Sequence, residues 1–248
     1  MSLKLITLNI EGNKHFDLVF PFITTYQPDI MCLQEVFAVD LAEFTSRFGG
    51  QILFTPMSNM KRVRTRVDTP RGLWGIAIWL RDGLQLASHE TLYYAGSHAS
   101  AHEDNDPGYD SSRVVIVAKI MHQDEEFVIA TTHFTWTPDG VADERQWRDF
   151  TSLITLLQPY PELVLCGDFN APRGGEIFSA LSEHFIDHLP PDVTSTLDPE
   201  LHRYKDAFEL AVDSIFATPS YLVENVTVRS GVSDHKAIVA QIGRAKSS

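Results

Sequence analysis

The sequence predicts an α+β protein in which two β-sheets pack together and helices cover their outer faces. Three observations predict this class. Apolar runs rich in β-branched residues recur along the 248 residues, helical periodicity falls between some of these runs, and strands outnumber helices. No repeat or convincing linker interrupts the pattern, so we expect a single domain over residues 1–248.

The positions of the strands and helices follow from the spacing of the apolar residues. We predict strands over residues 3–10, 29–33, 72–80, 114–120, 127–133, 163–166, 214–217, 223–228 and 237–242. Helical spacing predicts helices over residues 14–26, 39–48, 141–158 and 174–184. In the third helix, the residues expected on one apolar face are Val141, Trp147, Phe150, Ile154 and Leu157.

The charge balance bears on the partners of the protein. A formal net charge of −13 disfavours a protein that depends on non-specific duplex binding, because neutralising phosphates requires basic residues. The sequence still allows a local basic patch, since five basic residues lie within residues 61–71. No segment is long and apolar enough to span a bilayer, and residues 1–9 are typical of a first strand rather than a secretory signal. We therefore expect a cytoplasmic protein.

Two irregular stretches and two cysteines need separate interpretation. Residues 96–112 and 189–202 are long enough to be lids or binding loops, and solvated insertions are an equal alternative. Cys32 and Cys166 each lie within an apolar run. Two cysteines make neither a disulfide framework nor a zinc site, so we expect buried free thiols.

Polar side chains follow the ends of six apolar runs. These endings contain Asn9 and Glu11, Gln34 and Glu35, His133, Asp168 and Asn170, Asp213, and Asp234 and His235. A single terminal Asp or Asn is usually a turn residue and a lone histidine is usually structural, but six such endings favour a functional site. Hard oxygen ligands suit Mg²⁺ or Mn²⁺ rather than Zn²⁺, and two histidines with a spare carboxylate suit proton handling at a phosphoryl group.

The order of these motifs resembles that of the endonuclease/exonuclease/phosphatase superfamily. The motifs are TLNIEG (7–12), LQEV (33–36), TTHF (131–134), GDFNAP (167–172), VDSIF (212–216) and SDHKAI (233–238). The resemblance covers nearly the whole chain, and GDFN combined with a C-terminal SDH is specific. It implies a DNase I-like four-layer α/β/β/α sandwich, with two mainly antiparallel or mixed sheets flanked by helices.

The resemblance also implies a metal site. Glu35 would be the principal ligand of Mg²⁺ or Mn²⁺, with Asn9 beside it and Glu11 less directly involved. Asp234 would assist in binding the metal, either directly or through a water molecule.

The same resemblance implies catalytic roles. Asp168 would orient or deprotonate the attacking water, and Asn170 would hydrogen-bond the phosphate oxygens. Asp213 would pair with His235 and favour its protonated form, while His133 would face the phosphate or the leaving group. Either Asp168 or His235 would act as the base.

Three further residues have two interpretations each. Arg113 stands at the start of a predicted strand, where it would contact the substrate phosphate or form a surface salt bridge. Trp74 and Trp136 would either grip the substrate or pack in the interior, and packing is the more common role.

These features predict a metal-dependent hydrolase that cleaves phosphodiester or phosphomonoester bonds by in-line attack of an activated water. The expected substrate is either nucleic acid, as single strands or ends, or a small phosphorylated molecule. The alternative is a catalytically inactive module of the same fold that binds phosphate or a partner, although Glu35, Asp168 and His235 are all present. A structural domain with coincidental polar strand ends is the third interpretation.

Overall fold

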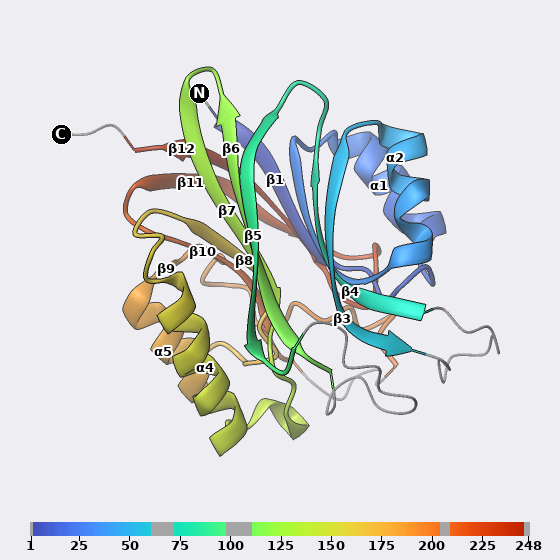
Figure 1. The fold of residues 1–248 in the computed structure, drawn as a ribbon. Coiled ribbons are helices and arrows are strands. Elements are labelled where there is room, and N and C mark those ends of the chain that lie inside the picture. Colours follow the sequence, from blue (N-terminus) through green and yellow to red (C-terminus); the bar gives the residue numbers. More distant parts are fainter. Residues whose placement is uncertain (1, 61–71, 98–110, 204–208, 246–248) are drawn as a thin grey trace.

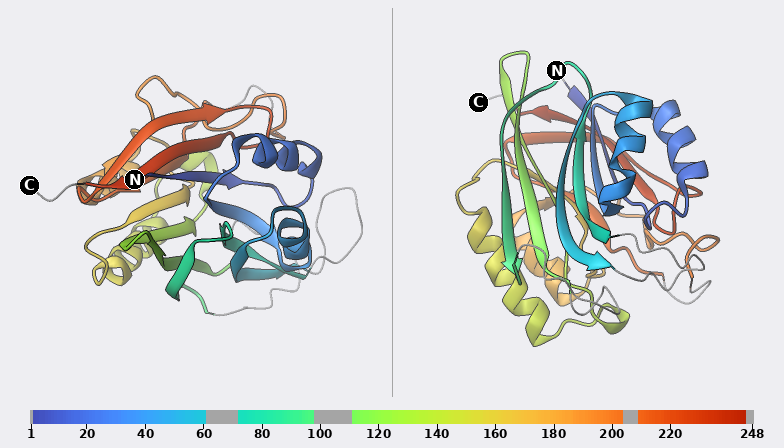
Figure 2. Two further views of the ribbon diagram at one scale, coloured as in Figure 1. Left: turned by 90° about the horizontal axis from the view of Figure 1, so that it is seen from above. Right: turned by 45° about the vertical axis from the view of Figure 1, so that its right-hand side comes forward.

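The computed structural model describes residues 2–60, 72–97, 111–203 and 209–245. Two six-stranded sheets lie face to face, with helices on both outer faces (Figures 1 and 2). The first sheet contains, in spatial order, β11 (Tyr221–Arg229), β12 (Ala237–Arg244), β1 (Ser2–Asn9), β2 (Ile30–Phe37), β4 (Gly72–Leu80) and β3 (Gln51–Met60). The second contains β5 (Gln85–Ala95), β6 (Arg113–His122), β7 (Glu125–His133), β8 (Val164–Asp168), β10 (Asp213–Ala217) and β9 (Ile186–Asp187).

The helices complete four layers and confirm the predicted sandwich. Helices α1 (Phe16–Tyr26) and α2 (Leu41–Phe48) cover the first sheet, and α4 (Glu144–Leu157) and α5 (Glu176–His184) cover the second. Successive side chains of a strand point to opposite faces, so Leu5 joins the core between the sheets while Ile6 packs toward α1. In both sheets one strand pair is parallel and the others are antiparallel.

All nine predicted strands are present, but the sequence missed β3, β5 and the two-residue β9. Strand β3 contains Pro56, which argues against a strand because it has no N–H to donate. The proline is tolerated because β3 is an edge strand with a register shift after Pro56. Strand β5 is the edge of the other sheet. Its residues Ser88, His89 and Glu90 are all exposed, so this part of the strand does not alternate between buried and exposed residues.

The predicted apolar face of the third helix is partly wrong. Helix α4 begins at Glu144, where the Asp143 side chain accepts a hydrogen bond from the Gln146 backbone and caps the helix. Val141 therefore precedes the helix and is 69% exposed. Trp147 is 39% exposed, whereas Leu153, which we did not assign to this face, is fully buried.

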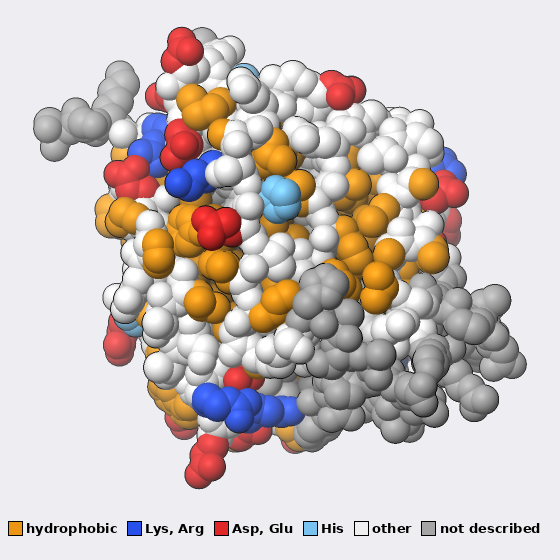
Figure 3. All heavy atoms as spheres, viewed as in Figure 1, with side chains coloured by type: hydrophobic (Ala, Val, Ile, Leu, Met, Phe, Trp, Pro, Cys, Tyr) orange, Lys and Arg blue, Asp and Glu red, His pale blue; other side chains and the backbone are white. Residues whose placement is uncertain are grey.

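Cys32 and Cys166 are buried free thiols, as predicted. Within the described ranges, no helix is both long and apolar enough to cross a bilayer. The predicted basic stretch 61–71 and most of the loop 96–112 lie outside the described residues. On the face shown in Figure 3, the described charged side chains are of both signs and lie scattered among apolar and uncharged ones.

Candidate active site

The two parallel strand pairs gather the candidate residues at one end of the sandwich. Strands β1 and β2 run parallel, and their pairing ends with Asn9 opposite Gln34. Strands β7 and β8 also run parallel and end with His133 opposite Asp168. The Gln34 side chain donates a hydrogen bond to the Thr131 hydroxyl (3.1 Å), which joins the two sheets near these strand ends. Polar residues that lie far apart in the sequence therefore meet here.

Asp168 is buried at the centre of this group. Its Oδ2 accepts a hydrogen bond from Asn9 Nδ2 (3.1 Å) and lies 3.4 Å from His133 Nε2 and 3.8 Å from His235 Nε2. Burial acts to raise the pKa of Asp168, but the charges of His235 and His133 outweigh it and hold the pKa well below its usual value. Asp168 is therefore ionised at neutral pH.

Asp213 and His235 form a buried pair beside Asp168. Asp213 Oδ2 lies 2.8 Å from His235 Nδ1, which leaves His235 Nε2 on the side of Asp168. Burial acts to lower the pKa of His235, but the charges of Asp213 and Asp168 hold it well above its ordinary value. The structure thus brings together the pair that the sequence predicted, with the imidazole favoured in its charged form.

The segment around Thr196 supports this pair. Thr196 Oγ1 donates a hydrogen bond to Asp213 Oδ2 (2.6 Å) and accepts one from each of the backbone N–H groups of Val212 (3.0 Å) and Asp213 (3.1 Å). The next residue, Leu197, forms an isolated β-bridge with His235. The irregular stretch 189–202 is therefore not a solvated insertion, because this part of it packs against the site.

We expect Thr196→Val to lower the free energy of unfolding by about 1–3 kcal/mol, because it leaves the buried Asp213 oxygen and two N–H groups without the hydroxyl. Urea titration followed by far-UV circular dichroism measures this loss. Thr151→Val is the matched control, since Thr151 lies on the exposed side of α4 and a surface change costs less than about 0.5 kcal/mol. Equal stability of the two variants would contradict the supporting role of Thr196.

Asp168 and Asn170 are placed by a turn at the end of a strand. Strand β8 ends at Asp168, and Asn170 adopts the left-handed conformation with φ of 48°. The Asn170 backbone N–H donates to Asp168 Oδ1 (2.9 Å), and its Nδ2 donates to the Phe134 carbonyl (3.0 Å). The turn thus holds Asn170 against the end of β7.

Gln146 of α4 is a supporting residue that the sequence did not indicate. It is fully buried, and its Nε2 donates to the carbonyl oxygens of Thr135 (2.6 Å) and Asn170 (3.2 Å). It therefore ties the segments after β7 and β8 to the helix that covers them. A glutamine within a helical pattern gives no sequence signal for this role, because most such residues face solvent.

The predicted metal ligands Glu35 and Asn9 are in contact. Glu35 has a left-handed backbone (φ 61°), and its Oε1 accepts a hydrogen bond from Asn9 Nδ2 (3.0 Å). Asn9 Oδ1 accepts one from the Glu11 backbone N–H (3.1 Å). Because Asn9 Nδ2 also reaches Asp168, one amide links the carboxylates of Glu35 and Asp168.

Asp234 completes the acidic part of the site. Burial raises the pKa of Asp234 to about 7, with the charges of Glu11 and Glu35 adding to the rise and the charge of His235 opposing it. Three carboxylates near one another in a partly buried site repel each other unless a cation lies between them. Their oxygen donors match the ligands that Mg²⁺ and Mn²⁺ prefer, so the residues present fit such an ion.

Arg113 and the two tryptophans occupy different positions around this site. Arg113 is 2% exposed, so a surface salt bridge is the wrong interpretation, and its guanidinium donates to the His133 carbonyl (3.3 Å). The buried Trp74 ring packs edge-on against the His133 ring, with centroids 5.6 Å apart. Trp136 is half-buried, and its carbonyl accepts a hydrogen bond from Arg145.

Comparisons with known structures agree with this architecture. The human Nocturnin catalytic domain has a TM-score of 0.74 at 20% identity, covering 98% of this chain and 94% of that chain. A mannosyl-6-phosphatase from Bacteroides thetaiotaomicron has a TM-score of 0.69 at 14% identity, covering 98% and 100%. Humanized D. rerio TDP2 has a TM-score of 0.67 at 16% identity, covering 98% and 99%. At these identities the likeness shows a shared fold.

A comparison with curated protein sequences gives no match. The model of the Endonuclease/Exonuclease/phosphatase family, however, matches residues 6–235. That range runs from β1 to His235 and contains each of the polar strand ends described above. The chain therefore belongs to the Endonuclease/Exonuclease/phosphatase family.

Proposed function

We propose that this protein is a hydrolase that uses a divalent metal to cleave phosphate ester bonds. Membership of the family supports phosphoesterase activity in general. The observation that carries the proposal is the position of Asp168, an ionised carboxylate that Asn9, His133 and His235 surround at distances of 3.1 to 3.8 Å. An anion held in this way can orient a water molecule, while His235, which is favoured in its charged form, provides positive charge for a phosphate.

The chain's own residues have separate tasks in this proposal. Asp168 accepts a hydrogen bond from the attacking water, and it is a better candidate for the base than His235, whose raised pKa favours the charged form. His235 and His133 stabilise the negative charge that develops on the phosphoryl oxygens. Asn170 and Arg113 contribute donors for the phosphate of the substrate, which are the roles that the sequence predicted for them.

Glu35, Asn9 and Asp234 would hold the metal, with Glu11 close by. When bound, Mg²⁺ or Mn²⁺ supplies charge neutralisation at a phosphate oxygen. The crowding of Glu11, Glu35 and Asp234 supports this assignment, because it adds to the effect of burial in raising the pKa of Asp234, and a cation would relieve the repulsion.

The substrate class is either nucleic acid, as single strands or ends, or a small phosphorylated molecule. The net charge of −13 favours a substrate that needs few phosphate contacts over a long duplex. A screen with bis-p-nitrophenyl phosphate, p-nitrophenyl phosphate and a labelled single-stranded oligonucleotide separates these classes. We expect turnover that requires Mg²⁺ or Mn²⁺, and activity that persists in excess chelator would contradict the metal requirement.

A thermal-shift measurement distinguishes the enzyme from a structural domain. We expect Mg²⁺ to raise the melting temperature of the wild type, because an ion that binds the folded state stabilises it by about 2.7 kcal/mol at 100 times its Kd. Glu35→Ala should remove this rise, whereas Glu125→Ala, at an exposed position of β7, should retain it. A metal-dependent rise without hydrolysis of any substrate would favour the inactive binding module.

A further inference from the structure

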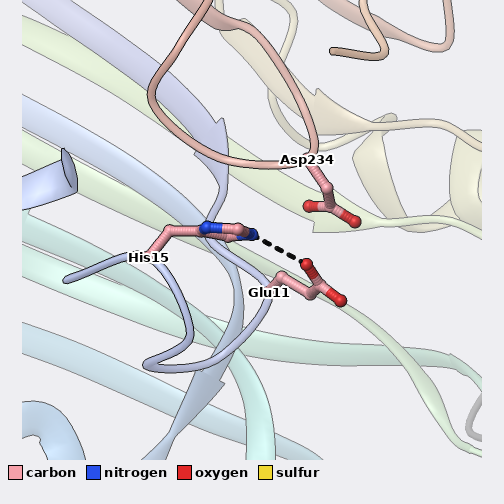
Figure 4. Close-up of side chains that lie close together, drawn as sticks. All are labelled: Glu11, His15 and Asp234. Atoms are coloured by element: carbon pink, nitrogen blue, oxygen red, sulfur yellow. Dashed lines mark hydrogen bonds and ion pairs between the residues drawn. The ribbon is translucent and has the colours of Figure 1, made fainter. Parts of the chain in front are cut away.

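Three side chains from two loops converge beside the active site, and one of them is a histidine that the sequence motifs left unassigned. Glu11 and His15 lie between β1 and α1, and Asp234 lies in the loop between β11 and β12 (Figure 4). One ligand atom of each lies within 4.8 Å of the other two. Ligands around an ion with bonds of about 2.2 Å lie up to about 4.4 Å apart, so small side-chain movements would complete a coordination site.

His15 is held in place within this group. It is 7% exposed, and its Nε2 lies 2.9 Å from Glu11 Oε2. Lys14 Nζ approaches the two oxygens of the same carboxylate at 2.7 and 2.8 Å. The Lys14 side chain is 43% exposed, so it can move into solvent when another cation binds Glu11.

Asp234 faces His15 and Glu11 without a hydrogen bond to either. Figure 4 shows its carboxylate directed toward the pair from the opposite loop. Within the described part of the chain, this carboxylate accepts a hydrogen bond at Oδ1 from Ser233 Oγ (3.1 Å). A half-buried carboxylate aimed at an imidazole and a second carboxylate is an arrangement that suits a bound cation.

We propose that His15 supplies a nitrogen ligand to the metal centre, which makes it a mixed carboxylate–imidazole site that favours first-row transition ions over Mg²⁺. The inference rests on the proposed function, because it assumes that a divalent ion binds at this site. Imidazole nitrogen is a good ligand for ions such as Co²⁺ and a poor one for Mg²⁺, which prefers oxygen. A histidine that only orients Glu11 would instead affect all divalent ions alike.

The test measures metal binding without substrate. Electron spin-echo spectroscopy of Mn²⁺ bound to the wild type should show modulation from a coordinated ¹⁴N nucleus, and His15→Gln should remove it. Calorimetry should show that His15→Gln weakens Co²⁺ binding about tenfold or more. Mg²⁺ binding should change less than about threefold, because it does not depend on nitrogen. His89→Ala, at an exposed histidine of β5, is the control and should change neither result.

Three outcomes would overturn the inference. The first is bound Mn²⁺ without ¹⁴N modulation in the wild type, a result that needs no variant to fold. The second is modulation that survives in a folded His15→Gln protein, and the third is equal loss of Co²⁺ and Mg²⁺ affinity. Each leaves the proposed function intact, whereas a wild type that binds none of these ions would overturn both.

Discussion

Asp168→Asn is expected to lower kcat by about 10³-fold or more while leaving KM within about threefold, because a group that acts only on the reacting water affects the chemical step. The carboxylate is the anion that Asn9, His133 and His235 surround. An amide at this position has the same shape but cannot accept a proton, and its NH₂ group opposes the donors around it. Steady-state kinetics on the best substrate of the screen measures the effect.

The control for this variant is Asp124→Asn, which makes the same chemical change in the exposed turn between β6 and β7. We expect it to retain wild-type kcat. Circular dichroism and a thermal scan establish that Asp168→Asn remains folded at the assay temperature. Substantial residual activity in the folded variant would contradict the role of Asp168.

Asp213→Asn should have the second largest effect, with kcat lowered by about 10²- to 10⁴-fold. Asp213 is one of three carboxylates that raise the pKa of His235, together with Asp168 and Asp234, so its neutralisation lowers that pKa. A cationic His235 is active below its pKa and loses its charge as the pH rises through it. The alkaline limb of the pH–rate profile should therefore move to lower pH in the variant.

Asp192→Asn, at an exposed position in the stretch 189–202, provides the comparison and should leave the profile unchanged. If Asp213→Asn also leaves the profile unchanged, the pair does not control the charge of His235. If only the acidic limb moves, His235 acts as a neutral base, and the assignment of this role to Asp168 is wrong.

Much of the fold could be predicted because the residues that a strand or helix buries are apolar and recur at a regular spacing in the sequence. The inner strands are apolar on one or both faces, so their runs stood out, as at Val164–Asp168. The edge strands β3 and β5 were missed because an edge tolerates Pro56 and exposed polar residues. The start of α4 was misplaced because its cap, Asp143, competes with other turn residues nearby.

The candidate site divides in the same way. The sequence by itself determined which polar residues end the strands. In the structure, the ends of the parallel pairs β1–β2 and β7–β8 lie together, so that Asn9 contacts Asp168. Only the tertiary structure revealed that Thr196 and Gln146 support the site and that His15 faces Asp234. These residues lie in loops or on a helix, where no repeating sequence pattern indicates which partner a polar side chain faces. Their roles depend on which distant segments pack against them, and that is decided when the two sheets and their helices assemble.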